Sequence, residues 1–184
     1  MLMIYKELAV FIQEDLVVYP AQGVGKIEAL EEQEIGGLAA EFYIIRIFDS
    51  NITVMVPVKN AKNVGLRELS TPKQAEEIFT FLEDRSDFTG YTGQNWNRRH
   101  REYTEKLNSA ALTDVAQVLK ELTLISGEKE LSFGEKRLLE QAVSLITTEL
   151  AFVLKEEPEA IKEKITLLFE DILDKQEENN EESA

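Results

Sequence analysis

The periodicity of apolar residues changes once along this chain, close to Pro72. Before that point, short runs rich in valine, isoleucine and aromatic residues are separated by glycines and by polar residues. After it, apolar residues recur every three or four positions. The first pattern is typical of short β-strands joined by turns, and the second of amphipathic helices. The sequence therefore predicts an α+β fold of more than one domain, in which a small β-barrel of the Tudor or SH3-like type is followed by an all-α helical bundle.

The β half has four candidate strand segments, DLVVYP, GVGKIEAL, AEFYIIRIF and NITVMVPV. Between these segments, the pair Gly36 and Gly37 and the residues 49–51 are typical of hairpin turns. Gly23 and Gly25 do not form a nucleotide-binding loop, because a third glycine, a lysine and a following helix are missing. We expect a β domain over residues 1–70, with its core at about 11–69.

The helical half is expected over residues 71–174. A short helix at 72–82 leads into an irregular loop, DRSDFTGYTG. Ser132 stands three residues before Glu135, which predicts a capping box at the start of a long helix, and Pro158 is placed to begin the last helix. The remaining residues, 175–184, are too polar to fold and are predicted to be a disordered acidic tail.

The charge of the chain is strongly negative but unevenly spread. The formal net charge is −15 and there is no cysteine, so disulfides and thiolate metal sites are excluded. The segment 95–107, which we call the basic segment, nevertheless carries four cations and only two acids. A strongly acidic protein is repelled by nucleic acid at long range, so this segment needs an explanation. The absence of a signal peptide or long apolar run predicts a cytoplasmic protein without a membrane partner.

Signatures of catalysis are missing from the sequence. The single histidine, His100, has no cysteine or second histidine to act with, and the acids Glu156, Glu157 and Glu159 lack the spacing of a calcium loop. We therefore expect no enzyme, no metal and no cofactor. An interaction protein is the favoured class.

The basic segment has the pattern of a helix with an aromatic stripe. If Asn95 caps the helix, Trp96 lies in its first turn and shares a face with His100, Tyr103 and Leu107 at helical spacing. Such stripes usually mark core packing. The alternative is contact with DNA, because cations flank the stripe: Arg98 and Arg101 on one side, Arg99 and Lys106 on the other. Guanidinium groups would then hold phosphates while the indole presses on a base step.

Four segments of the chain together resemble the CarD-like family of bacterial transcription regulators. They are VVYPAQGVGKIEAL, TVMVPVKNAKNVGLREL, NWNRRHREYTEKL and LSFGEKRLLEQAVSLITTELA. The resemblance covers about residues 11–154. It implies an N-terminal Tudor-like domain that binds the β subunit of RNA polymerase, and a helical domain that touches promoter DNA.

The resemblance also assigns roles to individual residues. Trp96 would wedge the minor groove at the upstream edge of the promoter bubble, with Arg98, Arg99 and Arg101 approaching the DNA backbone. Three residues of the β half fall where the family meets polymerase: Ile45, Met55 and Pro57. Gln33 and Met55 depart from relatives that carry arginine there, which implies a less charged polymerase contact. On the residues alone, barrel core and an edge-strand proline are the favoured interpretation of these apolar positions.

These expectations combine into a regulator that stabilises the promoter open complex. Binding to DNA should be weak unless polymerase tethers the protein and raises the local DNA concentration. We expect a monomer associated with the nucleoid through RNA polymerase. The alternative is a polymerase-bound adaptor whose helical domain binds another protein and buries Trp96.

Overall fold

The computed structural model describes residues 10–91, 93 and 95–174. The chain divides into two compact units, Met1–Leu69 and Ser70–Ala184. Strands occupy the first unit and helices the second, which confirms the predicted α+β class. The predicted acidic tail, 175–184, lies outside the described residues.

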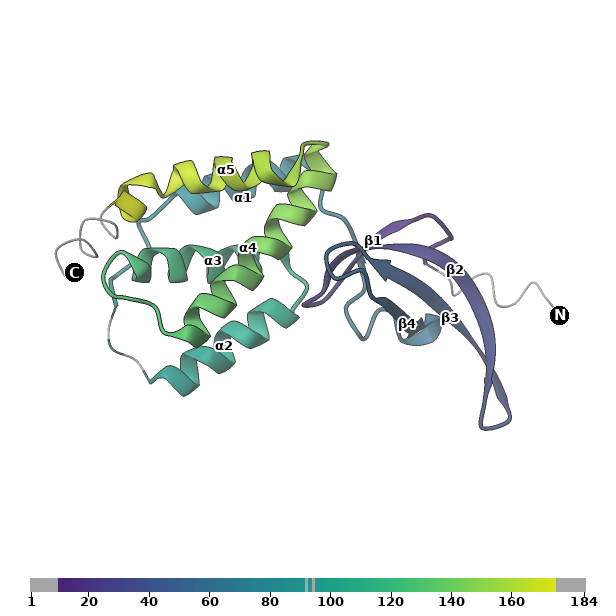
Figure 1. Ribbon diagram of the computed structural model, residues 1–184. Helices are drawn as coiled ribbons and strands as arrows, with labels where there is room; N and C mark the ends of the chain where they lie inside the picture. The colour runs from purple at the N-terminus through teal and green to yellow at the C-terminus, as the bar shows by residue number, and fades with distance from the viewer. Residues whose placement is uncertain (1–9, 92, 94, 175–184) are drawn as a thin grey trace. The chain divides into compact units, whose positions relative to one another are not determined.

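The first unit is a five-stranded antiparallel sheet in the order β4-β3-β2-β1-β5 (Figure 1). Its strands are β1 (Leu16–Tyr19), β2 (Gly23–Ile35), β3 (Leu38–Ile47), β4 (Thr53–Pro57) and β5 (Arg67–Glu68), with the 3-10 turn η1 (Val58–Asn60) after β4. This order leaves β4 at one edge of the sheet and β5 at the other.

The two predicted hairpin turns are confirmed. Gly36 and Gly37 form a two-residue turn between β2 and β3, with φ angles of 62° and 80°. Positive φ at both central residues gives a turn whose twist matches the strands, and glycine adopts it without strain. The second turn joins β3 to β4, and there Asn51 takes a positive φ of 54°.

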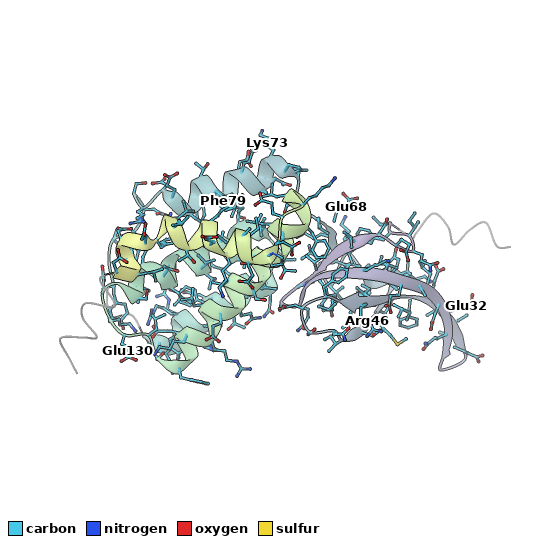
Figure 2. All side chains as sticks on the ribbon, turned by 45° about the horizontal axis from the view of Figure 1, so that its top comes forward. Glu32, Arg46, Glu68, Lys73, Phe79 and Glu130 are labelled. Carbon is cyan, nitrogen blue, oxygen red and sulfur yellow. The ribbon has the colours of Figure 1, made fainter. Side chains whose placement is uncertain are left out.

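The core of this unit is formed by the inward residues of the sheet. Val17, Ile27, Tyr43, Ile45 and Ile47 are each completely buried. The packing is so tight at Gly25 that it restricts the residue type there. A Cβ atom there would lie 2.8 Å from Cγ2 of Ile45 and 2.9 Å from the backbone oxygen of Arg46, a residue labelled in Figure 2. Only glycine fits at this position without a shift of β3.

The second unit is a bundle of α1 (Pro72–Glu83), α2 (Trp96–Asn108), α3 (Leu112–Ser126), α4 (Phe133–Leu154) and α5 (Pro158–Leu168). The longest helix, α4, contacts each of the others (Figure 1). The start of α1 is tied to it, because the backbone N–H and the hydroxyl of Ser70 both donate to Oε1 of Glu149, at 3.0 and 2.7 Å.

The predicted helix starts at Pro72, Phe133 and Pro158 are confirmed. Capping boxes begin two of these helices: Thr71 with Gln74 before α1, and Ser132 with Glu135 before α4. Proline begins α1 and α5, where its missing N–H costs no hydrogen bond. Among the described residues, no helix is long and apolar enough to cross a membrane.

Candidate nucleic-acid interface

The first turn of α2 is set by its cap. The side-chain oxygen of Asn95 accepts a hydrogen bond from the backbone N–H of Asn97 at 2.9 Å. This bond satisfies one of the N–H groups that the first turn of a helix leaves unpaired. Trp96 is the first helical residue, as the sequence predicts.

Trp96 is half-buried and packs against the core of the bundle. Its indole lies so close to α4 that a Cβ atom on Gly134 would be only 2.7 Å from Cζ2. The exposed ring of His100 meets it edge to face, with centroids 5.1 Å apart. The tryptophan is therefore neither a core residue nor a free one: backbone supports part of the ring and the rest reaches solvent.

Arg98 and Arg101 project from α2 into solvent. Arg98 is bound to Glu102 at 2.8 Å and Arg101 to Glu105 at 3.6 Å, each one turn along the same helix. The hydrogen bond with Glu102 raises the pKa of Arg98. Exposed pairs of this kind contribute little to stability, so a phosphate group can compete for either guanidinium.

Arg99 differs from both neighbours, because its side chain is buried. Nη2 donates to Oε1 of Glu135 at 2.9 Å, with both side chains almost inaccessible to solvent. The guanidinium also lies 5.0 Å from the ring centroid of Tyr91 and 5.8 Å from that of Trp96. Nε and Nη1 are buried without a hydrogen-bond partner among the described residues. The expectation that Arg99 holds a phosphate therefore needs correction, since this cation faces the protein.

Glu135 binds Arg99 while it caps α4. Its other oxygen accepts hydrogen bonds from Lys129 at 2.7 Å and from the backbone N–H of Ser132 at 2.8 Å. Burial alone would raise the pKa of Glu135, but the bonds from Lys129, Ser132 and Arg99 outweigh it and lower the pKa to about 2. We call Arg99, Lys129 and Glu135 the ion cluster. It connects the first turns of α2 and α4.

One exposed residue of this surface was missed by sequence reasoning. Phe133, the first residue of α4, is 82% exposed, and it precedes the glycine that contacts Trp96. The motif SFGEK contains this phenylalanine just after the cap Ser132. The cap gives no signal of this exposure, because Trp96 also directly follows a helix cap and is half-buried.

The sheet places the residues predicted to meet polymerase on two different faces. Ile45 is completely buried in the core, so its side chain is not available to a partner, and the core alternative holds for this position. Strand pairing joins Ile45 to Val54 and Ile44 to Met55. Because successive side chains alternate between faces, the outward neighbour of Met55 is Ile44, one residue from the predicted position.

Met55 and Pro57 lie on the edge strand β4. Met55 is 47% exposed and Pro57 half-buried. Gln33, the other position that departs from the family, lies on β2 opposite Ala40 and is half-buried. The exposed edge of β4 together with Ile44 and Met55 forms what we call the β4 surface.

Among residues 10–91, 93 and 95–174, no group of three histidine, aspartate or glutamate side chains is placed to hold a metal ion.

The chain matches two family models. Residues 11–70 match the CarD-like/TRCF RID domain, and residues 77–166 match the CarD C-terminal domain. A curated relative from Bacillus subtilis (strain 168), named "Putative transcription factor YdeB", is 30% identical over 140 residues, which are 76% of this chain and 89% of the relative.

Proposed function

Because this chain belongs to the CarD-like family of transcription factors, we propose that it holds the β subunit of RNA polymerase with its β domain and stabilises the promoter open complex with the start of α2. Binding the open promoter more tightly than the closed one shifts the equilibrium between them. A difference of about 1.4 kcal/mol changes that ratio about tenfold.

The observation that carries the proposal is the placement of Trp96. An aromatic side chain that presses on a base step must resist displacement, because unstacking a step costs a few kcal/mol. The indole rests on the backbone at Gly134 and beside the guanidinium of Arg99, while part of its surface stays open. Arg98 and Arg101 are exposed on the same helix and supply phosphate contacts.

Arg99 takes a different role in this proposal from that of a phosphate ligand. It is a positioning residue: its salt bridge to Glu135 fixes the guanidinium against the indole ring. Replacing Arg99 should therefore weaken promoter opening by the same factor at low and high salt. A phosphate contact would show a loss that shrinks as salt screens it.

The β4 surface is the proposed polymerase contact. An edge strand can accept a further strand from a partner through its backbone groups, while side chains set specificity. This surface offers an apolar contact formed by Ile44, Met55 and Pro57. Position 55 is a methionine here and not an arginine. Held on polymerase, the basic segment meets DNA at an effective concentration of about a millimolar, which overcomes the repulsion expected from a net charge of −15.

The test is the effect of Trp96→Ala on the lifetime of the open complex in reconstituted transcription. We expect polymerase binding to persist and the lifetime to fall about tenfold or more. Phe152→Ala is the matched control, because Phe152 is a partly exposed aromatic residue of α4, about five turns along that helix from Gly134. If Trp96→Ala left the lifetime of the open complex unchanged, Trp96 would not act as a wedge.

The adaptor function remains the second candidate, and the exposed Phe133 favours it. A phenylalanine that is 82% exposed beside Trp96 would also fit a protein partner. Crosslinking separates the two functions: a photoreactive group at position 133 should label promoter DNA if α2 and α4 face the bubble, and a protein if they serve as an adaptor.

A further inference from the structure

A cavity of about 600 Å³ lies between α3, α4 and α5 of the helical domain. Its volume is within the usual range for small-molecule sites, which commonly lie between the helices of bundles. The cavity takes no part in the contacts proposed for DNA or polymerase.

The floor of the cavity is apolar. It is built from residues of three helices: Leu119 on α3, Leu139 and Val143 on α4, Ile165 on α5, and Phe169 just after α5. Leu139 and Val143 are only partly buried. Apolar side chains that stay partly open inside a concave site are available to a hydrocarbon or an aromatic ring.

The rim carries three lysines and two acids. Lys129 is bound to Glu135, and Lys136 to Glu130 at 2.9 Å. Glu130 is labelled in Figure 2, on the loop between α3 and α4. Glu128, the second acid, accepts the backbone N–H of Tyr91 at 2.6 Å.

Lys162 is the third lysine of the rim, and it belongs to neither of these ion pairs. It lines the cavity from α5 and is exposed, and among the described residues no carboxylate forms an ion pair with it. Lys129 and Lys136 are already paired with carboxylates, so within the described lining Lys162 is the cation open to an anionic ligand. A ligand that matches both the floor and the rim has an apolar body and a single negative charge.

We propose that this cavity binds an amphipathic monoanion, a carboxylate with an aliphatic or aromatic body, whose head group pairs with Lys162 while its body covers the floor. This inference goes beyond the proposed function and does not rest on it. The site is close to the interface all the same, since Lys129 belongs both to the cavity and to the ion cluster beside Trp96.

Calorimetric titration of the full chain with sodium decanoate, below its micelle concentration, tests the site. Saturable binding to one site is expected. Lys162→Met should weaken it about threefold, as for one exposed ion pair, and Lys164→Met is the matched control. Lys164 is on the same helix but pairs with Glu156 at 2.6 Å and does not line the cavity. Thr166→Phe, at an exposed lining position, should block binding by filling the space.

Two further probes examine the ligand chemistry. Decanol, which lacks the charge, should bind more weakly than decanoate and should be insensitive to Lys162→Met. The cation decyltrimethylammonium should bind more weakly still. Absence of saturable decanoate binding, binding unaffected by Thr166→Phe, or equal binding of the cation would each overturn the proposal. None of these measurements involves polymerase or DNA, so their failure leaves the proposed function intact.

Discussion

The β4 surface and the start of α2 place their partner-facing residues in different ways. On β3 and β4, inward and outward residues alternate: Ile45 is completely buried, whereas Met55, on the neighbouring strand, is 47% exposed. In the basic segment, the buried Arg99 stands between two exposed residues, Arg98 and His100. In a strand, therefore, the residues that stabilise the core alternate with the residues that can contact a partner. In this helix, a buried charged residue lies in the middle of the contact surface.

The difference lies in what holds each surface in place. The sheet is stabilised by apolar packing beneath it, and outward substitutions leave that packing intact. The start of α2 is held to α4 through the ion cluster, in which Arg99 bridges Glu135 and the ring of Trp96. Substitutions in the ion cluster should therefore change stability and function together, and those on the β4 surface should change function alone.

The largest expected effect comes from Glu135→Ala. This change leaves the cations of Arg99 and Lys129 near a buried position without their carboxylate and also removes half of the capping box of α4. Breaking a buried ion pair costs about 3 to 5 kcal/mol. Denaturant unfolding should report the loss, with Glu130→Ala as control, since Glu130 makes an exposed pair with Lys136. Equal stability of the two variants would mean that the ion cluster does not hold the interface.

Acid should weaken the same cluster. The pKa of Glu135 is about 2 in the folded chain, against an ordinary value of 4.5. Because the folded pKa is the lower one, the stabilisation is fully present above about pH 4.5 and is lost as the pH falls toward 2. The shift corresponds to about 3 kcal/mol. Unfolding of the wild type and of Glu135→Gln should be compared between pH 6 and pH 2.5, and the gap between their stabilities should narrow with acid. A constant gap would contradict the lowered pKa.

A smaller effect examines the alternation in the sheet. Ile45→Val should destabilise the β domain by about 1 kcal/mol, because it removes one buried methylene from a packed core. Ile44→Val, one residue away on the half-buried outward face, should cost clearly less. Thermal melting of both variants measures the difference. If Ile44→Val were the more damaging change, Ile44 and not Ile45 would face the core, and the pairing of β3 with β4 would have to shift by one residue.

Much of the fold was predictable because it depends on local patterns. The pair Gly36 and Gly37 specified a two-residue hairpin through positive φ angles, and the capping box of Ser132 and Glu135 specified the start of α4. The burial of Arg99 was not predictable in the same way. It depends on Glu135, 36 residues further along the chain, and the helical pattern of α2 gives no sign of that partner. Ile45 shows a second limit. A family resemblance locates a strand in the sequence, but it does not say which of two neighbouring residues faces the core.

The smallest effect separates the exposed arginines from the buried one. Arg101→Gln should leave the stability unchanged, because the exposed pair with Glu105 contributes only a few tenths of a kcal/mol. In the complex with polymerase, it should weaken binding to promoter DNA more at low salt than at high salt, and it should reduce the slope of log affinity against log salt by about one. Arg99→Gln should instead lower the melting temperature and leave that slope unchanged, because Arg99 faces Glu135 and not solvent. Titrations of forked promoter DNA over a range of potassium chloride concentrations provide both slopes. If Arg99→Gln reduced the slope as Arg101→Gln does, Arg99 would have to leave Glu135 and reach a phosphate in the complex, and the ion cluster would be a resting arrangement of the free protein.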